Sequence, residues 1–162
     1  MKIRAAGPGD LPFLRETLAR AAGWRCEDVD RRLAEHPGVS RYLDGFGRAG
    51  DAAVIAEDEF GRSTGAAWYR YFSADEPGFG FVGPDVPELT IAVSPEARGR
   101  GTGTALLTSL IDRAAKDGVR ALSLSVEEDN PAVRLYQRLG FVPAGAHENA
   151  ITMRLDLIPP AR

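Results

Sequence analysis

The stretch of residues 88–103 constrains the fold of this chain most, because it passes from a strand pattern through a turn to a helix pattern. Apolar residues alternate with other residues at its start, as in a strand with one buried face. Ser94-Pro95 ends the strand, and Gly99, Gly101 and Gly103 lead into an apolar run typical of a helix. The first amides of a helix lack intrahelical partners and lie at the positive end of its dipole, so this bare backbone favours an anion, above all a diphosphate.

Two nucleotide-binding loops do not fit this stretch. A Walker loop requires Gly-Lys before Ser or Thr, whereas Gly101 and Gly103 each precede a threonine directly. The dinucleotide fingerprint requires a third glycine at the position of Thr104 or Leu106. What is left is the pattern Arg98-x-x-Gly101-x-Gly103 between a strand and an amphipathic helix. A glycine-rich turn that binds nothing is the alternative that such a short motif leaves open.

The pattern resembles the coenzyme A diphosphate loop of the GCN5-related N-acetyltransferase (GNAT) superfamily. Residues 130–141 resemble the second signature of that family, in which an asparagine is followed by a tyrosine and then by Gly-Phe. Here these residues are Asn130, Tyr136 and Gly140-Phe141. The two motifs stand in the family's order, about thirty residues apart with a helix and a strand between them. The resemblance covers most of the chain and is weakest over residues 23–50.

The resemblance implies an α/β (α+β) fold with a mixed central sheet of about seven strands and about four flanking helices. The N-terminal half of the sheet would be antiparallel, with a parallel, splayed pair of strands in the middle. It also implies acetyl-CoA as the cosubstrate and no metal. The activity it implies is direct acetyl transfer to a primary amine of a small molecule or peptide in a ternary complex. The residues implied to bind the coenzyme are Ile91, Ala92, Val93, Arg98, Gly99, Arg100, Gly101, Thr102, Gly103, Thr104, Asn130 and Tyr136.

Two side chains are expected to carry the chemistry. Tyr136 lies where family members place the hydroxyl that protonates the departing thiolate, and a phenol is protonated at neutral pH. Its alternative role is packing beside the cofactor. Glu88 begins the strand near the expected thioester and is the candidate base, directly or through water, the alternative being a solvated glutamate. Asn130 could bind the coenzyme or cap a helix, and Arg98 could bind phosphate or be solvated.

The remaining patterns alternate strand and helix. Strands are expected at residues 3–6, 52–57, 63–72, 121–126, 141–143 and 150–157, and helices at 11–22, 27–35, 131–139 and after the glycine loop as far as Gly118. Asp10 is expected as the N-cap of the first of these helices. Residues 39–50 carry signals for both a short helix and a loop and stay unassigned. The last strand, 150–157, could join a homodimer.

Length and charge exclude several classes of protein. The 162 residues fit a single domain, 1–162, and the formal net charge of −3 argues against a nucleic-acid binder. No apolar run is long enough for a membrane helix, and residues 1–4 lack a signal sequence's apolar core, so the cytoplasm is expected. Cys26 is the single cysteine and suggests neither a disulfide nor a metal site.

Between Tyr71 and Ala97 the chain has no lysine or arginine but several acidic residues, which favours a cationic acceptor. Two other functions stay open. The fold could bind acetyl-CoA as a non-catalytic sensor or interaction module, or the loop could take another phosphate ligand, such as a nucleotide.

Overall fold

The computed structural model describes residues 1–25 and 27–158, so the expectations for Cys26 lie outside the described residues. The strands are β1 (Lys2–Ala5), β2 (Ala52–Glu57), β3 (Ser63–Arg70), β4 (Glu88–Val93), β5 (Ala121–Glu127), β6 (Val142–His147) and β7 (Ala150–Asp156). The helices are α1 (Leu11–Ala21), α2 (Val29–Glu35), the single turn α3 (Pro37–Ser40), α4 (Thr102–Lys116) and α5 (Ala132–Arg138), with 3-10 turns at Pro8–Asp10 and Pro95–Ala97.

The strands form one mixed sheet in the order β1-β2-β3-β4-β5-β7-β6. The pairs β1–β2, β5–β7 and β6–β7 are antiparallel, and β4–β5 is parallel. This confirms the predicted fold class of about seven strands with one parallel pair. The predicted splay of that pair and the single domain stay predictions, because the chain divides into two compact units. Unit 1 contains Met1–Trp68 and Thr90–Leu110, and unit 2 contains Tyr69–Leu89 and Ile111 onwards.

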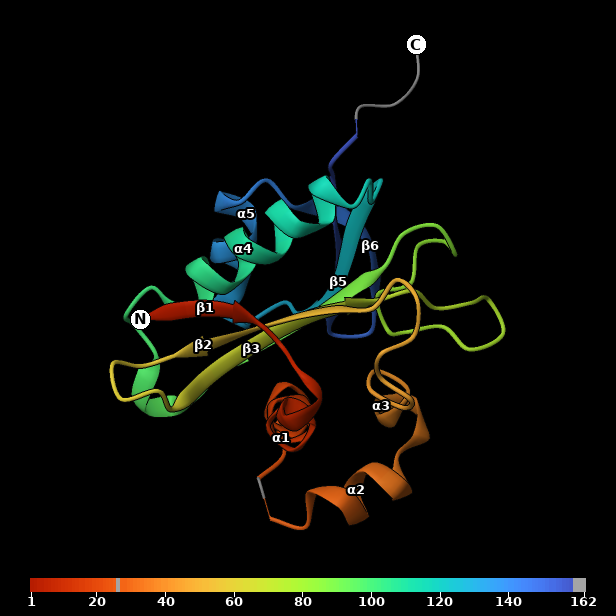
Figure 1. The fold of residues 1–162 in the computed structure, drawn as a ribbon. Coiled ribbons are helices and arrows are strands. Elements are labelled where there is room, and N and C mark those ends of the chain that lie inside the picture. The colour runs from red at the N-terminus through yellow and green to blue at the C-terminus, as the bar shows by residue number, and fades with distance from the viewer. Residues whose placement is uncertain (26, 159–162) are drawn as a thin grey trace. The chain divides into compact units, whose positions relative to one another are not determined.

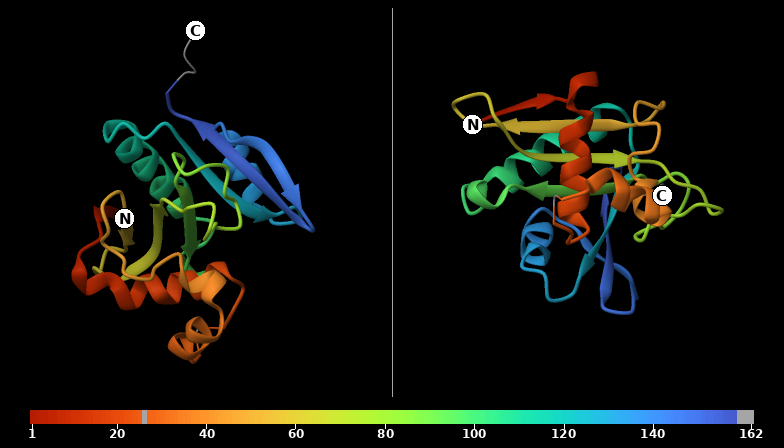
Figure 2. Two further views of the ribbon diagram at one scale, coloured as in Figure 1. Left: turned by 90° about the vertical axis from the view of Figure 1, so that its right-hand side faces the viewer. Right: turned by 90° about the horizontal axis from the view of Figure 1, so that it is seen from below.

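In unit 1, α1 covers one face of the N-terminal strands. Leu14 and Leu18, one helical turn apart, are 1% and 3% exposed, because residues at i and i+4 share a helix face. The helix crosses β2 in the view from below in Figure 2 and lies beneath β1 and β2 in Figure 1. The fully buried side chains of Ile55 and Trp68 add to this core, and the Trp68 indole N–H donates to the Tyr42 carbonyl at 3.1 Å.

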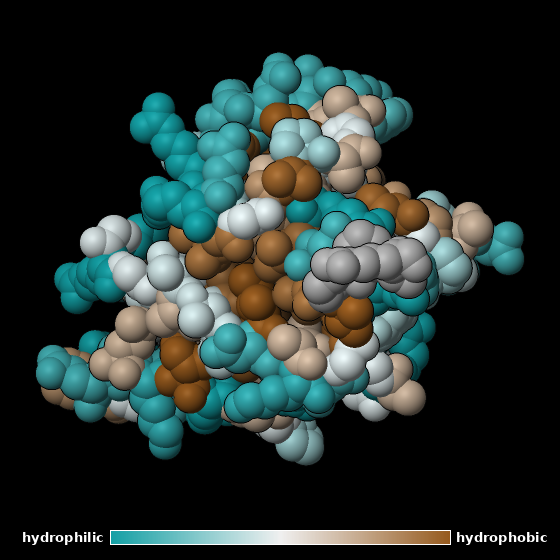
Figure 3. Space-filling view, turned by 90° about the horizontal axis from the view of Figure 1, so that it is seen from above, coloured by the Kyte–Doolittle hydropathy of each residue, from teal (hydrophilic) through white to brown (hydrophobic). Residues whose placement is uncertain are grey.

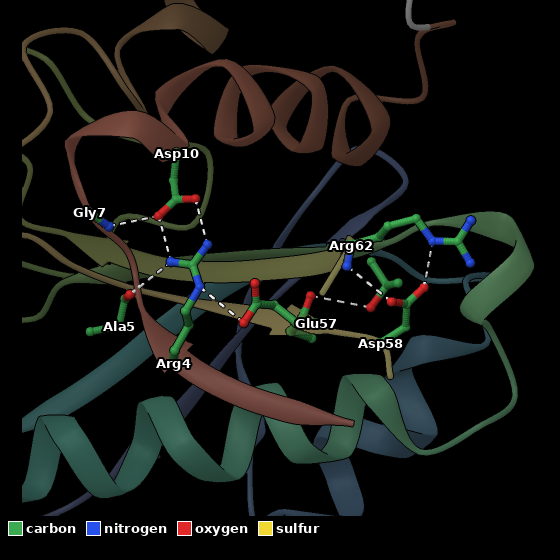
Figure 4. Close-up of polar contacts among 9 residues, drawn as sticks. Arg4, Ala5, Gly7, Asp10, Glu57, Asp58 and Arg62 are labelled. Atoms are coloured by element: carbon green, nitrogen blue, oxygen red, sulfur yellow. Dashed lines mark hydrogen bonds and ion pairs between the residues drawn. The ribbon is translucent and has the colours of Figure 1, made fainter. Parts of the chain in front are cut away.

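Asp10 stands at the N-cap position of α1, as predicted, but its side chain does not cap the helix. Its two carboxylate oxygens accept hydrogen bonds from the Arg4 guanidinium at 2.7 and 2.8 Å, and the Gly7 amide donates at 2.7 Å (Figure 4). The Arg4 Nε lies 3.3 Å from a carboxylate oxygen of Glu57 on β2. The cap prediction is therefore wrong about the side chain, because a charged, bidentate partner outcompetes the helix amides.

In unit 2, β7 lies between β5 and β6 and is hydrogen-bonded on both sides. Figure 2 shows β6 and β7 side by side as a hairpin. Residues 150–157 therefore cannot pair through a free strand edge with a second copy of the chain. The homodimer itself stays a prediction. β6, which is longer than the strand predicted at 141–143, is exposed along its whole length and carries Pro143, a residue that blocks edge pairing.

Hydrophobic residues also reach the surface, and Figure 3 shows them gathered amid hydrophilic ones on one face. The large exposed hydrophobic residues are Met1 and Phe60 in unit 1 and Phe79, Val142 and Ile158 in unit 2. Within the described part of the chain, no helix has the length and hydropathy needed to cross a membrane. The unassigned residues 39–50 hold the end of α3 and turns with positive φ at Gly45, Gly47 and Gly50.

Candidate active site

The glycine loop lies in unit 1 between β4 and α4. The strand ends at Val93. The amide of the next residue, Ser94, donates to the Thr64 carbonyl at 2.7 Å, and the Ser94 hydroxyl lies 3.5 Å from the Arg20 guanidinium. Gly99 and Gly101 then adopt φ of 74° and 79°, which side chains with a Cβ rarely adopt. These two glycines are therefore required by the backbone conformation of the loop.

The start of α4 has the features of an anion site. The Ala105 amide donates the first α-helical hydrogen bond, to the Gly101 carbonyl at 3.0 Å. The amides of residues 102–104 precede that bond and have no acceptor within the helix. Arg98 and Arg100 are exposed beside them, and no Cβ contact would crowd Gly99 or Gly101. Fifteen residues of α4 add their dipoles behind these amides, so the loop can hold a diphosphate.

The three β4 residues expected at the pantetheine arm, Ile91, Ala92 and Val93, are half-buried. A Cβ at Gly65 on β3 would lie 3.2 Å from the Ala92 carbonyl oxygen and 3.3 Å from a Val93 methyl. Gly65 therefore lets β3 approach this part of β4 closely, which fixes the strand that leads into the loop.

Glu88, the candidate base, lies in unit 2 and is 2% exposed. Its Oε1 accepts a hydrogen bond from the Gly80 amide at 2.8 Å. It pairs in register with Ser123 of β5, whose amide donates to the Pro87 carbonyl at 3.0 Å. The alternative of a solvated glutamate is wrong, because the side chain is buried and bound by a backbone amide. The role of Glu88 as the general base stays a prediction.

Tyr136, the candidate acid, lies on α5 in unit 2 and is 7% exposed. Its ring meets Phe141 edge-on, with centroids 5.9 Å apart, and the Phe141 amide donates to the Tyr136 carbonyl at 3.0 Å. Burial raises the pKa of the Tyr136 phenol to about 12. The hydroxyl therefore carries its proton throughout the neutral range, as a proton donor must.

Asn130 is exposed and precedes Pro131, which holds the N-cap position of α5. The Asn130 side-chain oxygen accepts a hydrogen bond from the Ala132 amide at 2.9 Å, at the first residue of α5. Its role as a coenzyme ligand stays a prediction. Convergence of the glycine loop with Glu88 and Tyr136 on one acetyl-CoA also stays a prediction, since the loop belongs to unit 1 and the two side chains to unit 2.

The positions of Gly80 and Ser123 beside Glu88 were not predicted from the sequence. Gly80 is one of several glycines in an irregular loop, and its contact with Glu88 spans eight residues of chain without a periodic pattern. A signal for Ser123 does exist, since it is a polar residue flanked by two leucines in a buried strand. Among the described residues, no group of three or more His, Cys, Asp or Glu side chains could hold a metal ion.

Comparison with known proteins identifies the family. The model of the acetyltransferase (GNAT) family matches residues 15–141. The chain belongs to this family. It is 33% identical over 149 residues to the L-methionine sulfoximine/L-methionine sulfone acetyltransferase of Pseudomonas paraeruginosa, across 88% of this chain and 81% of that protein. Family membership makes it an enzyme of the N-acetyltransferase class.

Two further proteins are similar to part or all of the chain. L-2,4-diaminobutyric acid acetyltransferase of Nocardia farcinica is 38% identical over 106 residues, which cover 51% of this chain and 55% of that protein. The chain thus spans about half the length of this relative. The solved structure of yncA from Salmonella typhimurium with its cofactor acetyl-CoA has a TM-score of 0.69 and 26% identity, and covers 100% of this chain and 96% of that one.

Proposed function

We propose that this GNAT protein transfers an acetyl group from acetyl-CoA directly to a primary amine of a small molecule or peptide. The observation that carries the proposal is the start of α4, where Gly99 and Gly101 with positive φ lead into helix amides that have no helical acceptor. A diphosphate fits that backbone. The similar yncA structure contains acetyl-CoA, which supports this donor over a nucleotide.

Glu88 and Tyr136 supply the two proton transfers that the reaction needs. The amine nitrogen attacks the thioester carbonyl, the C–N bond forms, and the C–S bond breaks. Glu88 takes the proton that leaves the nitrogen, directly or through water, and Tyr136 gives its proton to the departing sulfur. Because a thioester is already activated, holding the two reactants in place is the larger part of the catalysis.

The proposed acceptor is a small amine, with a cationic one favoured by the acidic loop before β4. Two relatives are named for acceptors that are amino acids or their derivatives, diaminobutyric acid and methionine sulfone. Asp75, Glu76 and Asp85 are exposed in the loop, and no lysine or arginine lies between Tyr71 and Ala97. Carboxylates there would attract an ammonium group.

The test is release of free thiol from acetyl-CoA with a panel of amines. The panel comprises L-methionine sulfone, L-2,4-diaminobutyric acid, spermidine and a peptide with a free N-terminus. Thiol release with at least one of them, matched by an acetylated product in mass spectrometry, supports the proposal. Calorimetry with acetyl-CoA, ATP and NAD runs beside it. Tight binding of acetyl-CoA without thiol release would favour the sensor or interaction module instead. The cytoplasmic location and the homodimer stay proposals.

A further inference from the structure

The segment from Gly78 to Phe81 holds one exposed aromatic ring between two buried glycines. Gly78 and Gly80 are buried, whereas Phe79 is 65% exposed. The Phe81 amide approaches the Gly78 carbonyl at 3.3 Å and closes a tight turn. The backbone of this turn is thus seated in unit 2 while the Phe79 ring points outward.

Gly80 anchors the turn directly on β5. A Cβ at this position would lie 2.6 Å from the Leu124 carbonyl carbon, 2.7 Å from its oxygen and 2.8 Å from the Ser125 nitrogen. Backbone atoms cannot move aside as a flexible side chain can, so no larger residue fits without displacing the turn. The anchor fixes the position of Phe79, its neighbour in the chain.

The same glycine connects the turn to the candidate base. The Gly80 amide that donates to Glu88 Oε1 at 2.8 Å belongs to the peptide bond between Phe79 and Gly80. Phe79 is therefore one peptide group away from the carboxylate. An amine whose nitrogen gives its proton to Glu88 therefore approaches the short segment that carries Phe79.

We infer that Phe79 determines acceptor specificity by contacting the carbon chain next to the reacting amine. This inference rests on the proposed function and deepens it. The acceptor class is a primary amine with an apolar chain, since an exposed phenyl ring gains most from burying apolar surface. The acidic residues around the turn attract the ammonium end, and Phe79 selects the chain that follows it.

The test compares n-hexylamine with ethylamine, two amines of equal charge that differ in apolar length. The variants are Phe79→Ala, the conservative Phe79→Leu, and Phe60→Ala as the matched control. Phe60 is 73% exposed in the turn between β2 and β3, where Arg62 stacks on its ring at 5.1 Å. The quantities measured are kcat and the KM for each amine at saturating acetyl-CoA, and the KM for acetyl-CoA.

The unchanged chain and Phe60→Ala should show a KM for n-hexylamine roughly tenfold below that for ethylamine, the ratio that about 1.4 kcal/mol of apolar contact gives. Phe79→Ala should bring the two values within about twofold of each other, with Phe79→Leu in between and the KM for acetyl-CoA unchanged. A tenfold ratio that persists in Phe79→Ala, or no preference in the unchanged chain, overturns the inference.

Failure of the proposed function is recognised separately, by acetyl-CoA binding without thiol release for any amine. In that case calorimetric titration of n-hexylamine into the coenzyme A-saturated chain decides the inference. Binding that Phe79→Ala weakens and Phe60→Ala preserves supports it. Equal binding by both variants, or none by the unchanged chain, overturns it.

Discussion

Glu88 of β4 lies opposite Ser123 of β5 in the parallel register, and both side chains are buried, at 2% and 0% exposure. Residues paired in register share one face of a sheet, so a carboxylate and a hydroxyl stand together inside unit 2. The Ser123 hydroxyl has no hydrogen-bond partner among the described residues. A buried polar group without a hydrogen bond costs free energy in a core, so the Ser123 hydroxyl is expected to lower the stability of the fold.

Replacing Ser123 by alanine should leave stability unchanged or raise it by up to about 1 kcal/mol, because the change removes a buried hydroxyl that forms no bond among the described residues. Ser40→Ala is the matched control. The Ser40 hydroxyl, also buried, lies 3.2 Å from Asp44 Oδ2, so its loss should cost about 1 kcal/mol. Urea unfolding of both variants measures the difference. Destabilisation of Ser123→Ala by more than the control would mean that the hydroxyl is bonded in solution.

Glu88→Gln should keep the fold and lose turnover. The glutamine carbonyl can still accept the Gly80 amide, so the anchor of the loop survives while the proton acceptor is gone. Loss of a general base typically costs about 10²–10⁴ in rate. Thiol release at saturating acetyl-CoA and amine measures kcat, and the thermal midpoint reports the fold. Undiminished kcat would leave Glu88 a structural residue that holds Gly80.

Tyr136→Phe should lower kcat at least tenfold while keeping the edge-on packing against Phe141. The pKa of about 12 means that ionisation of Tyr136 cannot produce an alkaline limb in the pH–rate profile below about pH 11. Because the pKa of Tyr136 is raised in the folded state, the free energy of unfolding should fall as the pH rises from about 10 towards 12. The Tyr136→Phe variant should not show this fall. Equal kcat in both proteins would assign Tyr136 to packing alone.

The strand, glycine loop and helix of residues 88–116 follow from the sequence because each is encoded locally, by alternation, by Gly99 and Gly101, and by an apolar helix face. Asp10 marks the limit of such local patterns. Its N-cap position was predictable, but the guanidinium of Arg4 draws the side chain away from the helix amides. The burial of Glu88 depends on Gly80, which reaches it through tertiary folding of an irregular loop, so neither residue's environment could be predicted from neighbours in the chain.

Gly101→Ala should weaken acetyl-CoA binding without introducing a clash. The φ of 79° costs a residue with a Cβ about 1–2 kcal/mol, whereas a Cβ there would meet nothing within 4 Å. The loop then shifts, and we expect Kd for acetyl-CoA to rise about tenfold, the equivalent of about 1.4 kcal/mol. Gly9→Ala is the control, since a Cβ there also meets nothing within 4 Å and its φ is not positive. Calorimetry that gives equal Kd for both variants would contradict a role for the loop conformation.

Asp10→Asn should remove part of the chain's acid sensitivity. The hydrogen bonds from Arg4 hold the pKa of the Asp10 carboxyl at about 2, below its ordinary value, and its side chain is 15% exposed. A depressed pKa adds stability that is present above about pH 4 and lost as the pH falls towards 2, here on the order of 2 kcal/mol. Asp10→Asn should therefore be less stable than the unchanged chain at pH 7 and nearly equal to it at pH 2.

Asp30→Asn is the control, because its carboxylate is 83% exposed in an ion pair with Arg15. This variant should change stability at pH 7 by less than about 0.5 kcal/mol. Urea unfolding between pH 2 and 7 measures these differences, and a gap for Asp10→Asn that does not close with falling pH would show that its cost is not electrostatic.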